Sequence, residues 1–189
     1  DVTALQIGRF PDVLSLEDVA VNQESIKEQL MKALSEAAGH FSDSREKEGE
    51  NLKTDILAKL EGMKENVAFI EERYPSIVSE YRKKLEDKVA ELLEDSNIDE
   101  SRIAAEVVLF SDKICNDEET VRLHSHIQGM KKMLEEKEGI GRKLDFIAQE
   151  MNREANTILS KANDLEVSNY AIDLKTEIEK VREQIQNIE

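Results

Sequence analysis

Apolar residues recur every three or four positions along most of the chain, and charged residues fill the positions between them. This spacing is typical of helices that bury one narrow face. No proline interrupts the stretch from Glu24 to Tyr74, which is rich in helix-forming residues and is predicted to be helical. The clearest apolar row is formed by Leu52, Ile56, Leu60, Met63, Val67, Ile70 and Tyr74, and it continues as Ile77, Tyr81, Leu85, Val89 and Leu92.

Pro75 stands in the middle of this row and fits either the first position of a new helix or a kink within one long rod. We expect two helices, because a narrow apolar stripe needs a partner that returns along it. The sequence therefore predicts an antiparallel, coiled-coil-like helical hairpin over residues 23–97, preceded by a connecting segment over residues 1–22.

A second group of helices is predicted after a loop from Glu94 to Glu100. The expected helices are Arg102 to Ile114, Asp117 to Lys137, Arg142 to Lys161 and Glu166 to Ile188. The last carries the apolar row Val167, Ala171, Leu174, Ile178, Val181, Ile185 and Ile188. Its partner surface is either in the same chain or in another subunit. The predicted fold class is all-α, a hairpin followed by a bundle of about four helices, with the candidate active site in a C-terminal domain over residues 98–189.

Composition excludes several classes of protein. Seven glycines and two prolines are too few for the many turns of a β-sandwich or barrel. The chain has neither a run of about 18 apolar residues nor a secretory signal, so no membrane partner is expected. Cys115 is the only cysteine, which excludes an internal disulfide and suits a reducing cytosol.

The net charge of −16 argues against general phosphate binding, because affinity for polyanions comes from lysine and arginine. The stretch from Gly139 to Lys161 is different. It holds four cations against three acids, a net of +1 that leaves −17 for the rest of the chain; the cations are Arg142, Lys143, Arg153 and Lys161, and the acids are Asp145, Glu150 and Glu154. This stretch would not repel an anion.

Two carboxylates in this stretch point to chemistry. Glu150 and Glu154 lie one helical turn apart, about 6 Å between Cβ atoms, and repel each other unless a divalent metal or an arginine lies between them. The amides Gln149, Asn152 and Asn156 are also unusual, because asparagine forms helices poorly. The alternative is an ordinary solvated helix face whose cations compensate nearby acids.

A second candidate group lies earlier in the chain. Glu119, Arg122 and His126 follow the spacing i, i+3, i+7, which puts an acid, a base and a titratable imidazole on one helix face, with Glu118 beside them. Such a face is more often a set of surface ion pairs than a catalytic group.

Three segments together resemble the bacterial YicC (YloC) family. They are the run from Gly141 through Lys161, the pattern Glu118-Glu119-x-x-Arg122-Leu123-x-x-His126, and the ending Arg182-Glu-Gln-Ile-Gln-Asn-Ile-Glu189. Arg45-Glu-Lys-Glu-Gly49 and the stretch after it resemble the central part of the same family. The resemblance covers essentially the whole chain and is strongest over Gly141 to Lys161.

This resemblance implies a cytoplasmic bacterial endoribonuclease that depends on a divalent cation, Mn²⁺ or Mg²⁺, and cuts single-stranded RNA as a ring-like homo-oligomer, with a hexamer expected for the full-length protein. Family members carry an additional amino-terminal α/β region whose basic and Ser-Met-Thr-Gly-Phe-type motifs are not found here. We therefore expect the amino-terminal part of the family to be missing, and a chain without it to be inactive if that part completes the site.

The resemblance leads to a hypothetical assignment of roles. Metal ligands would be Glu150 and Glu154, with Asp145, since hard cations prefer oxygen. His126, oriented by Glu118 or Glu119, is the candidate acid or base. The candidate RNA-binding residues are Arg142, Lys143, Gln149, Asn152, Arg153, Asn156 and Lys161.

Two other interpretations stay open. The chain could be a non-catalytic, oligomeric adaptor or scaffold in RNA decay, in which the basic stretch binds RNA without cutting it. The composition of Gly139 to Lys161 could also serve subunit packing alone, in which case loss of Arg153 would disturb assembly before it affects RNA.

Overall fold

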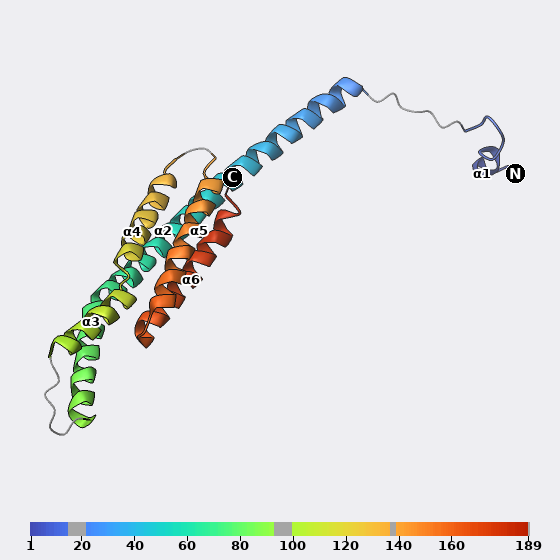
Figure 1. Ribbon diagram of the computed structural model, residues 1–189. Helices are drawn as coiled ribbons and strands as arrows, with labels where there is room; N and C mark the ends of the chain where they lie inside the picture. The colour runs from blue at the N-terminus through green and yellow to red at the C-terminus, as the bar shows by residue number, and fades with distance from the viewer. Residues whose placement is uncertain (15–21, 93–99, 137–138, 189) are drawn as a thin grey trace. The chain divides into compact units, whose positions relative to one another are not determined.

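The computed structural model describes residues 1–14, 22–92, 100–136 and 139–188. The chain is all-α, as predicted, and the described residues contain no strand. Its helices are α1 (Ala4–Ile7), α2 (Gln23–Leu92), α3 (Glu100–Ile114), α4 (Asp117–Met133), α5 (Gly141–Lys161) and α6 (Leu165–Ile185) (Figure 1). The four helices expected after the long one are therefore present, each within a few residues of its predicted bounds. The predicted loop at Glu94 to Glu100 falls almost wholly outside the described residues.

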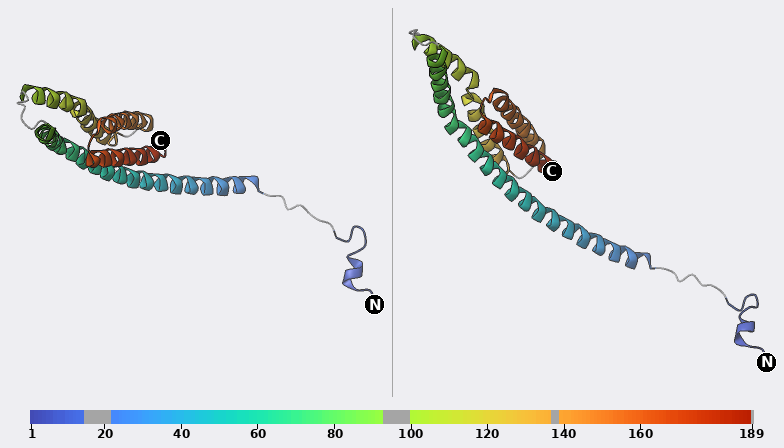
Figure 2. Two further views of the ribbon diagram at one scale, coloured as in Figure 1. Left: turned by 60° about the horizontal axis from the view of Figure 1, so that its bottom comes forward. Right: turned by 90° about the horizontal axis from the view of Figure 1, so that it is seen from below.

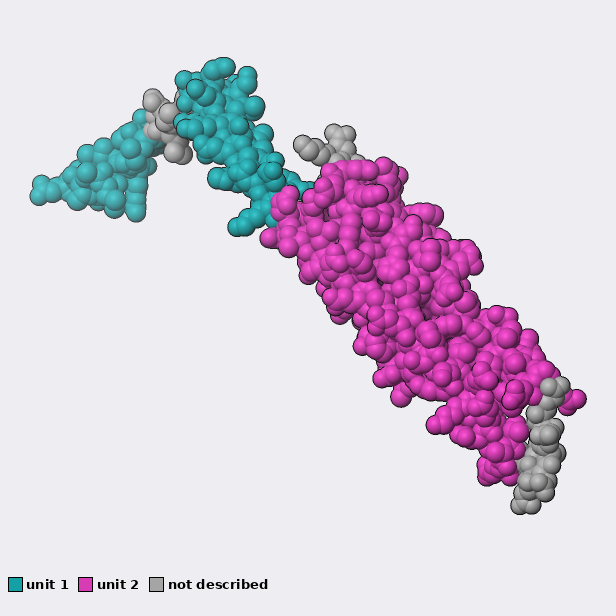
Figure 3. Space-filling view, turned by 90° about the vertical axis from the view of Figure 1, so that its left-hand side faces the viewer, with its two compact units in different colours: residues 1–47 teal, residues 48–189 magenta. Residues whose placement is uncertain are grey.

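Residues 1–47 and residues 48–189 form two compact units (Figure 3), and each is described by itself. The first unit holds α1 and the beginning of α2. Every described residue of α2 in this unit is exposed, so this part of the helix has no packing partner among the described residues of its unit. None of the described helices combines the length and apolar composition that crossing a membrane requires.

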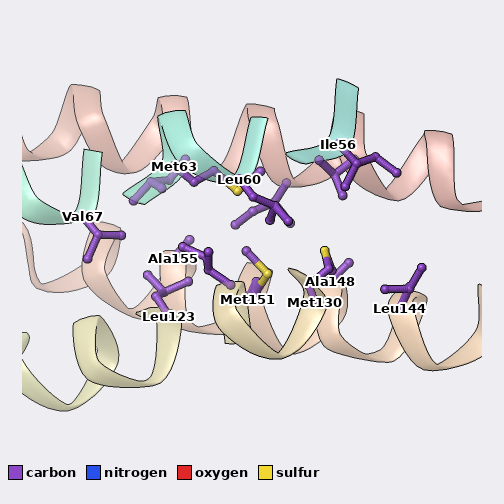
Figure 4. Close-up of a cluster of buried hydrophobic side chains, with 14 of the residues drawn as sticks. Ile56, Leu60, Met63, Val67, Leu123, Met130, Leu144, Ala148, Met151 and Ala155 are labelled. Atoms are coloured by element: carbon purple, nitrogen blue, oxygen red, sulfur yellow. The ribbon is translucent and has the colours of Figure 1, made fainter. Parts of the chain in front are cut away.

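The second unit is a bundle in which α4, α5 and α6 pack along the adjoining part of α2 (Figures 1 and 2). Ile56, Leu60, Met63, Val67 and Ile70 of α2 are buried, which confirms the predicted apolar row. Figure 4 shows Ile56, Leu60, Met63 and Val67 opposite side chains of α4 and α5 such as Leu123, Met130 and Met151. The α6 row from Val167 to Ile185 is buried in the same core, so its partner surface lies in this chain.

The reversal expected at Pro75 is not observed, because α2 continues through this residue (Figure 1). Contacts on both sides of the proline hold the helix together. Arg73 donates to both carboxylate oxygens of Glu80, at 2.7 and 3.0 Å, across the position where the proline lacks a backbone donor. This hydrogen bonding lowers the pKa of Glu80 below its ordinary value. Pro75 itself is exposed, so its ring meets solvent rather than the core.

The partner that returns along the end of α2 is α3. Tyr81 stacks on Phe110 with ring centroids 3.7 Å apart, and the hydroxyl of Tyr74 donates to the backbone oxygen of Ser111 at 2.8 Å. Later residues of α2 thus meet earlier residues of α3, so the two helices are antiparallel. An antiparallel pair exists, as predicted, but it forms after Leu92 rather than at Pro75.

Asp164 joins the start of α6 to α2. Its Oδ1 accepts the backbone N–H of Val167 at 3.1 Å and caps the helix, while its Oδ2 accepts from Arg73 at 3.0 Å. One carboxylate therefore satisfies an unpaired helix donor and compensates a half-buried guanidinium.

Asp164→Ala is expected to lower the free energy of unfolding by about 1–2 kcal/mol, because the N-cap is lost. Asp164→Asn keeps a capping oxygen and removes only the charge, so it is expected to cost less than Asp164→Ala. Urea unfolding followed by circular dichroism measures both. Equal losses in the two variants would show that the cap contributes nothing.

Candidate functional site

The candidate site is built on α5, which lies between α4 and α6. Its buried face carries Leu144, Ala148, Met151, Ala155 and Ile158, close to the predicted row, in which Ile147 is half-buried. The remaining positions form three surfaces: one facing α4, one facing α6, and one exposed between them.

Gly141 fixes the beginning of α5 against the end of the chain. A Cβ atom built on this residue would lie 2.6 Å from the backbone oxygen of Ile188, closer than real Cβ contacts. The preceding Gly139 has a φ of 62°, a left-handed conformation that glycine adopts without strain. These two glycines therefore turn the chain into α5 and let it pass under the C-terminal segment; they do not bind phosphate in any motif of their own.

On the surface facing α4, Glu154 is buried and compensated by Arg122. Its Oε1 lies 3.4 Å from Nη1 of Arg122, and its side chain is only 6% exposed. Arg122 is about half exposed and also pairs with Glu118, one turn earlier on α4. The charge of Glu154 is thus compensated by an arginine of another helix, whereas no cation of the described residues pairs with Glu150.

A second ion pair crosses the same interface, this time with the base on α5 and the acid on α4. Lys161 of α5 donates to Glu119 of α4 at 2.8 Å and to the backbone oxygen of Cys115 at 3.0 Å. The side chain of Glu119 is 9% exposed. Each helix therefore contributes one acid and one base. Lys161, a predicted phosphate ligand, lies in a structural position instead.

The surface facing α6 contains another paired acid. Asp145 accepts from Arg182 Nε at 3.0 Å and from Gln149 Nε2 at 2.7 Å. The hydrogen bond to Asp145 raises the pKa of Arg182. Asn152 donates to Glu179 of α6 at 2.6 Å, and its own Oδ1 is buried without a partner within the described part of the chain.

The three predicted metal ligands do not converge. Asp145 and Glu154 are nine residues apart, about two and a half helical turns, so they lie on opposite sides of α5. Asp145 faces α6 and Glu154 faces α4. Among residues 1–14, 22–92, 100–136 and 139–188, no group of three or more histidine, cysteine, aspartate or glutamate side chains could hold a metal ion.

His126 of α4 and Glu150 of α5 lie at the same height along the two antiparallel helices. These helices contact each other at Arg122 and Glu154, and again at Gly129 and Ile147, where a Cβ atom built on the glycine would lie 4.0 Å from Ile147 Cδ1. His126 and Glu150 stand between these two contacts, one turn or less from each on their own helices. Both are half-buried, and neither forms a hydrogen bond or ion pair with another described residue. The predicted partners Glu118 and Glu119 are bound to Arg122 and Lys161 instead.

The exposed surface of α5 carries a row without any acid, which we name the α5 stripe. Its members recur at steps of four and three residues and are all exposed: Arg142, Phe146, Gln149, Arg153, Asn156 and Ser160. Neither Arg142 nor Arg153 is ion-paired to a described residue. A shallow, open hollow lies along the C-terminal half of this stripe, lined by Gln149, Asn152, Arg153, Asn156, Thr157 and Ser160. Lys143 lies just beside the stripe and is paired with an acid: its Nζ is 3.5 Å from Oε2 of Glu136.

Sequence reasoning missed several residues of this site. Phe146, Thr157 and Ser160 were not among the candidates, although Phe146 stands at helical spacing between two candidate arginines and that spacing could have indicated it. Arg182 and Glu179 belong to another helix, and nothing in their local sequence indicates contact with α5.

Comparison with known families identifies the chain's relatives. A family model described as "Endoribonuclease YicC-like, C-terminal" matches residues 70–189, and one described as "Endoribonuclease YicC-like, N-terminal region" matches residues 1–54. The second match corrects the expectation that the family's amino-terminal part is missing, since residues 1–54 correspond to that region. The expectation relied on a few short motifs, whereas the family model compares every position.

Two curated relatives are named "Probable endoribonuclease YicC". The protein from Clostridioides difficile (strain 630) is 40% identical over 190 residues, a match covering 100% of this chain and 65% of the relative. The protein from Haemophilus influenzae is 30% identical over 191 residues, covering 100% of this chain and 64% of the relative. The chain thus spans slightly less than two thirds of the length of these relatives.

Arg122→Ala is expected to lower the free energy of unfolding at neutral pH by roughly 1–3 kcal/mol, because it leaves the buried Glu154 carboxylate without a cation. The half-exposed position of Arg122 keeps the loss below that of a fully buried pair.

Adding Glu154→Gln to this variant is expected to recover most of the loss, and Arg102→Ala, at an exposed arginine of α3, serves as the control. Chemical unfolding at neutral pH measures all three. A deficit in Arg122→Ala that Glu154→Gln does not reduce would contradict the assignment of this pair.

Proposed function

The chain belongs to the YicC-like endoribonuclease family, and from this premise we propose that it is an endoribonuclease that binds single-stranded RNA along the α5 stripe and cleaves it beside the interface of α4 and α5. The single observation that carries this proposal is the contrast between the stripe and the rest of the chain. A protein with a net charge of −16 presents an exposed helix face that has no acid and two arginines, neither of them ion-paired within the described part of the chain.

Charge and hydrogen-bonding capacity support RNA as the ligand. Arg142 and Arg153 supply positive charge for phosphates, while Gln149, Asn156 and Ser160 offer donors and acceptors for ribose and base edges. Acids elsewhere on the surface would repel the same polyanion, so RNA would be confined to this face. The cytoplasm, where the resemblance locates the family, supplies such RNA.

His126 is the proposed proton-transfer group, and Glu150 is proposed to orient it. Cleavage of a phosphodiester bond requires a proton to leave the attacking oxygen and another to reach the leaving oxygen, and an imidazole performs either role near neutral pH. Glu150, at the same register on α5, is the acid available to orient this imidazole. Glu150 also adjoins the α5 stripe, because it is one turn from Phe146 and three residues from Arg153.

The divalent cation implied by the resemblance does not find a ready donor set among the described residues. Glu154 is bound to Arg122, Glu119 to Lys161 and Asp145 to Arg182, which leaves Glu150 as the unpaired carboxylate of the predicted set. We therefore derive no step through a metal. Dependence on Mn²⁺ or Mg²⁺ remains part of the proposal as a condition to be tested.

The pairing of these acids also favours a second candidate function. A chain that binds RNA on the α5 stripe and lacks a working site would be an adaptor that presents RNA to another nuclease. We further propose that the chain forms a homo-oligomer, hexameric in the complete protein. Support for assembly comes from the first unit, where one helix exposes Ile26, Leu30, Met31, Leu34 and Phe41.

His126→Gln is expected to reduce cleavage of single-stranded RNA by roughly 100-fold or more while leaving RNA affinity unchanged, because only proton transfer is lost. His40→Gln, at an exposed histidine of the first unit, is the matched control. Cleavage of end-labelled RNA by the purified chain is measured with Mn²⁺, with Mg²⁺ and with a chelator. If wild-type chain binds RNA but cuts it in none of these conditions, the adaptor function is correct; if His126→Gln cuts as fast as wild type, His126 is not the proton-transfer group.

Arg153→Ala is expected to weaken RNA binding at every sequence tested, because one phosphate contact is removed. The slope of the logarithm of the binding constant against the logarithm of salt concentration is expected to become shallower by about one. Fluorescence anisotropy of labelled RNA across a range of salt concentrations measures both quantities. Arg102→Ala is the control. Identical affinity and salt dependence in Arg153→Ala and wild type would remove the α5 stripe from the RNA-binding surface.

A further inference from the structure

Phe146 is an exposed aromatic side chain in the middle of the α5 stripe. Its exposed fraction is 62%, although its neighbours Leu144 and Ile147 both contribute to the core. Arg142 precedes it by one turn, Gln149 follows three residues later, and Arg153 follows two turns later. Single exposed apolar side chains are common on protein surfaces, but the position of this ring among cations and amides suits a ligand with an aromatic or apolar face.

The neighbouring groups narrow the chemistry of this ligand. Arg142 and Arg153 are 11 residues apart on the helix, roughly 16 Å along its axis, and lie on either side of the ring. Two cations at this separation suit a chain of phosphates rather than one small anion. Asn156 offers both a donor and an acceptor without a partner among the described residues. A ligand that combines phosphates, an aromatic face and polar edges is a nucleic acid with exposed bases.

We propose that Phe146 is a base-stacking residue that selects unpaired nucleotides. This inference rests on the proposed RNA binding and deepens it. In a duplex each base face is covered by its neighbours, whereas an unstacked base of a single strand can lie flat on the ring while Arg142 and Arg153 hold the phosphates on either side. The strand is then held next to Glu150 on the α4 side of the stripe, where the proposed cleavage takes place. The preference for single strands thus comes from stacking on the Phe146 ring, since the arginines contact phosphates, which single strands and duplexes both have.

The first test removes the ring. Phe146→Ala is expected to weaken binding of a short oligoadenylate by between about 5-fold and 100-fold, the contribution of one stacked base. Binding of a ribose–phosphate oligomer that lacks bases is expected to be unchanged, because stacking makes no contribution to it. Leu109→Ala, at an α3 side chain that is 64% exposed, is the control for removing an exposed apolar group.

The second test observes stacking directly. The chain contains no tryptophan, so Phe146→Trp introduces a single indole whose fluorescence reports on this position. Oligoadenylate is expected to quench this fluorescence and to bind at least as tightly as to wild type, since indole also stacks on bases. Val108→Trp on α3 is expected to show no quenching. The base-free oligomer is expected to quench neither indole.

The outcomes separate this inference from the proposed function. If Phe146→Ala binds oligoadenylate as tightly as wild type while Arg153→Ala binds it more weakly, RNA binding stands and stacking is wrong. If Phe146→Ala changes the molar mass measured by light scattering, the ring belongs to a protein contact and the inference is overturned. If the wild-type chain binds no RNA, both proposals fail.

Discussion

Two ion pairs across the interface of α4 and α5 determine which groups of the site remain available. Glu154 is neutralised by Arg122 and Glu119 by Lys161, so each helix compensates a buried acid of the other. A buried carboxylate without such a cation would destabilise the bundle. These pairs occupy Glu154 and Lys161, both of which the sequence suggested for function. Arg142 and Arg153, on the exposed side of the same helix, form no ion pair with a described residue.

The helices of this fold could be predicted because burial depends on one helix face, and a face is visible as spacing in the sequence. The apolar row from Ile56 to Ile70 and the apolar row from Val167 to Ile185 are buried as predicted. Pro75 was misjudged because α2 contacts other helices next to this residue, from Arg73 to Asp164 and from Tyr74 to Ser111, and a local argument does not include these neighbours. The candidate site was predicted in part for the same reason. The exposed Arg142, Arg153 and Asn156 follow from helical spacing, whereas the pairing of Asp145 with Arg182 depends on the register between two helices.

The proposed function assigns binding and chemistry to different residues. The α5 stripe combines cations, amides and an aromatic ring, which suits a flexible polyanion with exposed bases. His126 and Glu150 stand at its edge, at one register of two antiparallel helices, and the rigid core beneath them holds both in place. Under the proposed function, an acidic chain binds RNA without a large basic surface because one face is free of acids.

The most direct test of this account is to map where RNA touches the chain. Photo-cross-linking with a thiouridine-containing single strand, followed by mass spectrometry of the digested protein, identifies the contacted residues. The account predicts cross-links within residues 142–160 of α5, with Phe146 among them, and none on α3. Cross-links confined to α3 or to the end of α2, with α5 unlabelled, would contradict it.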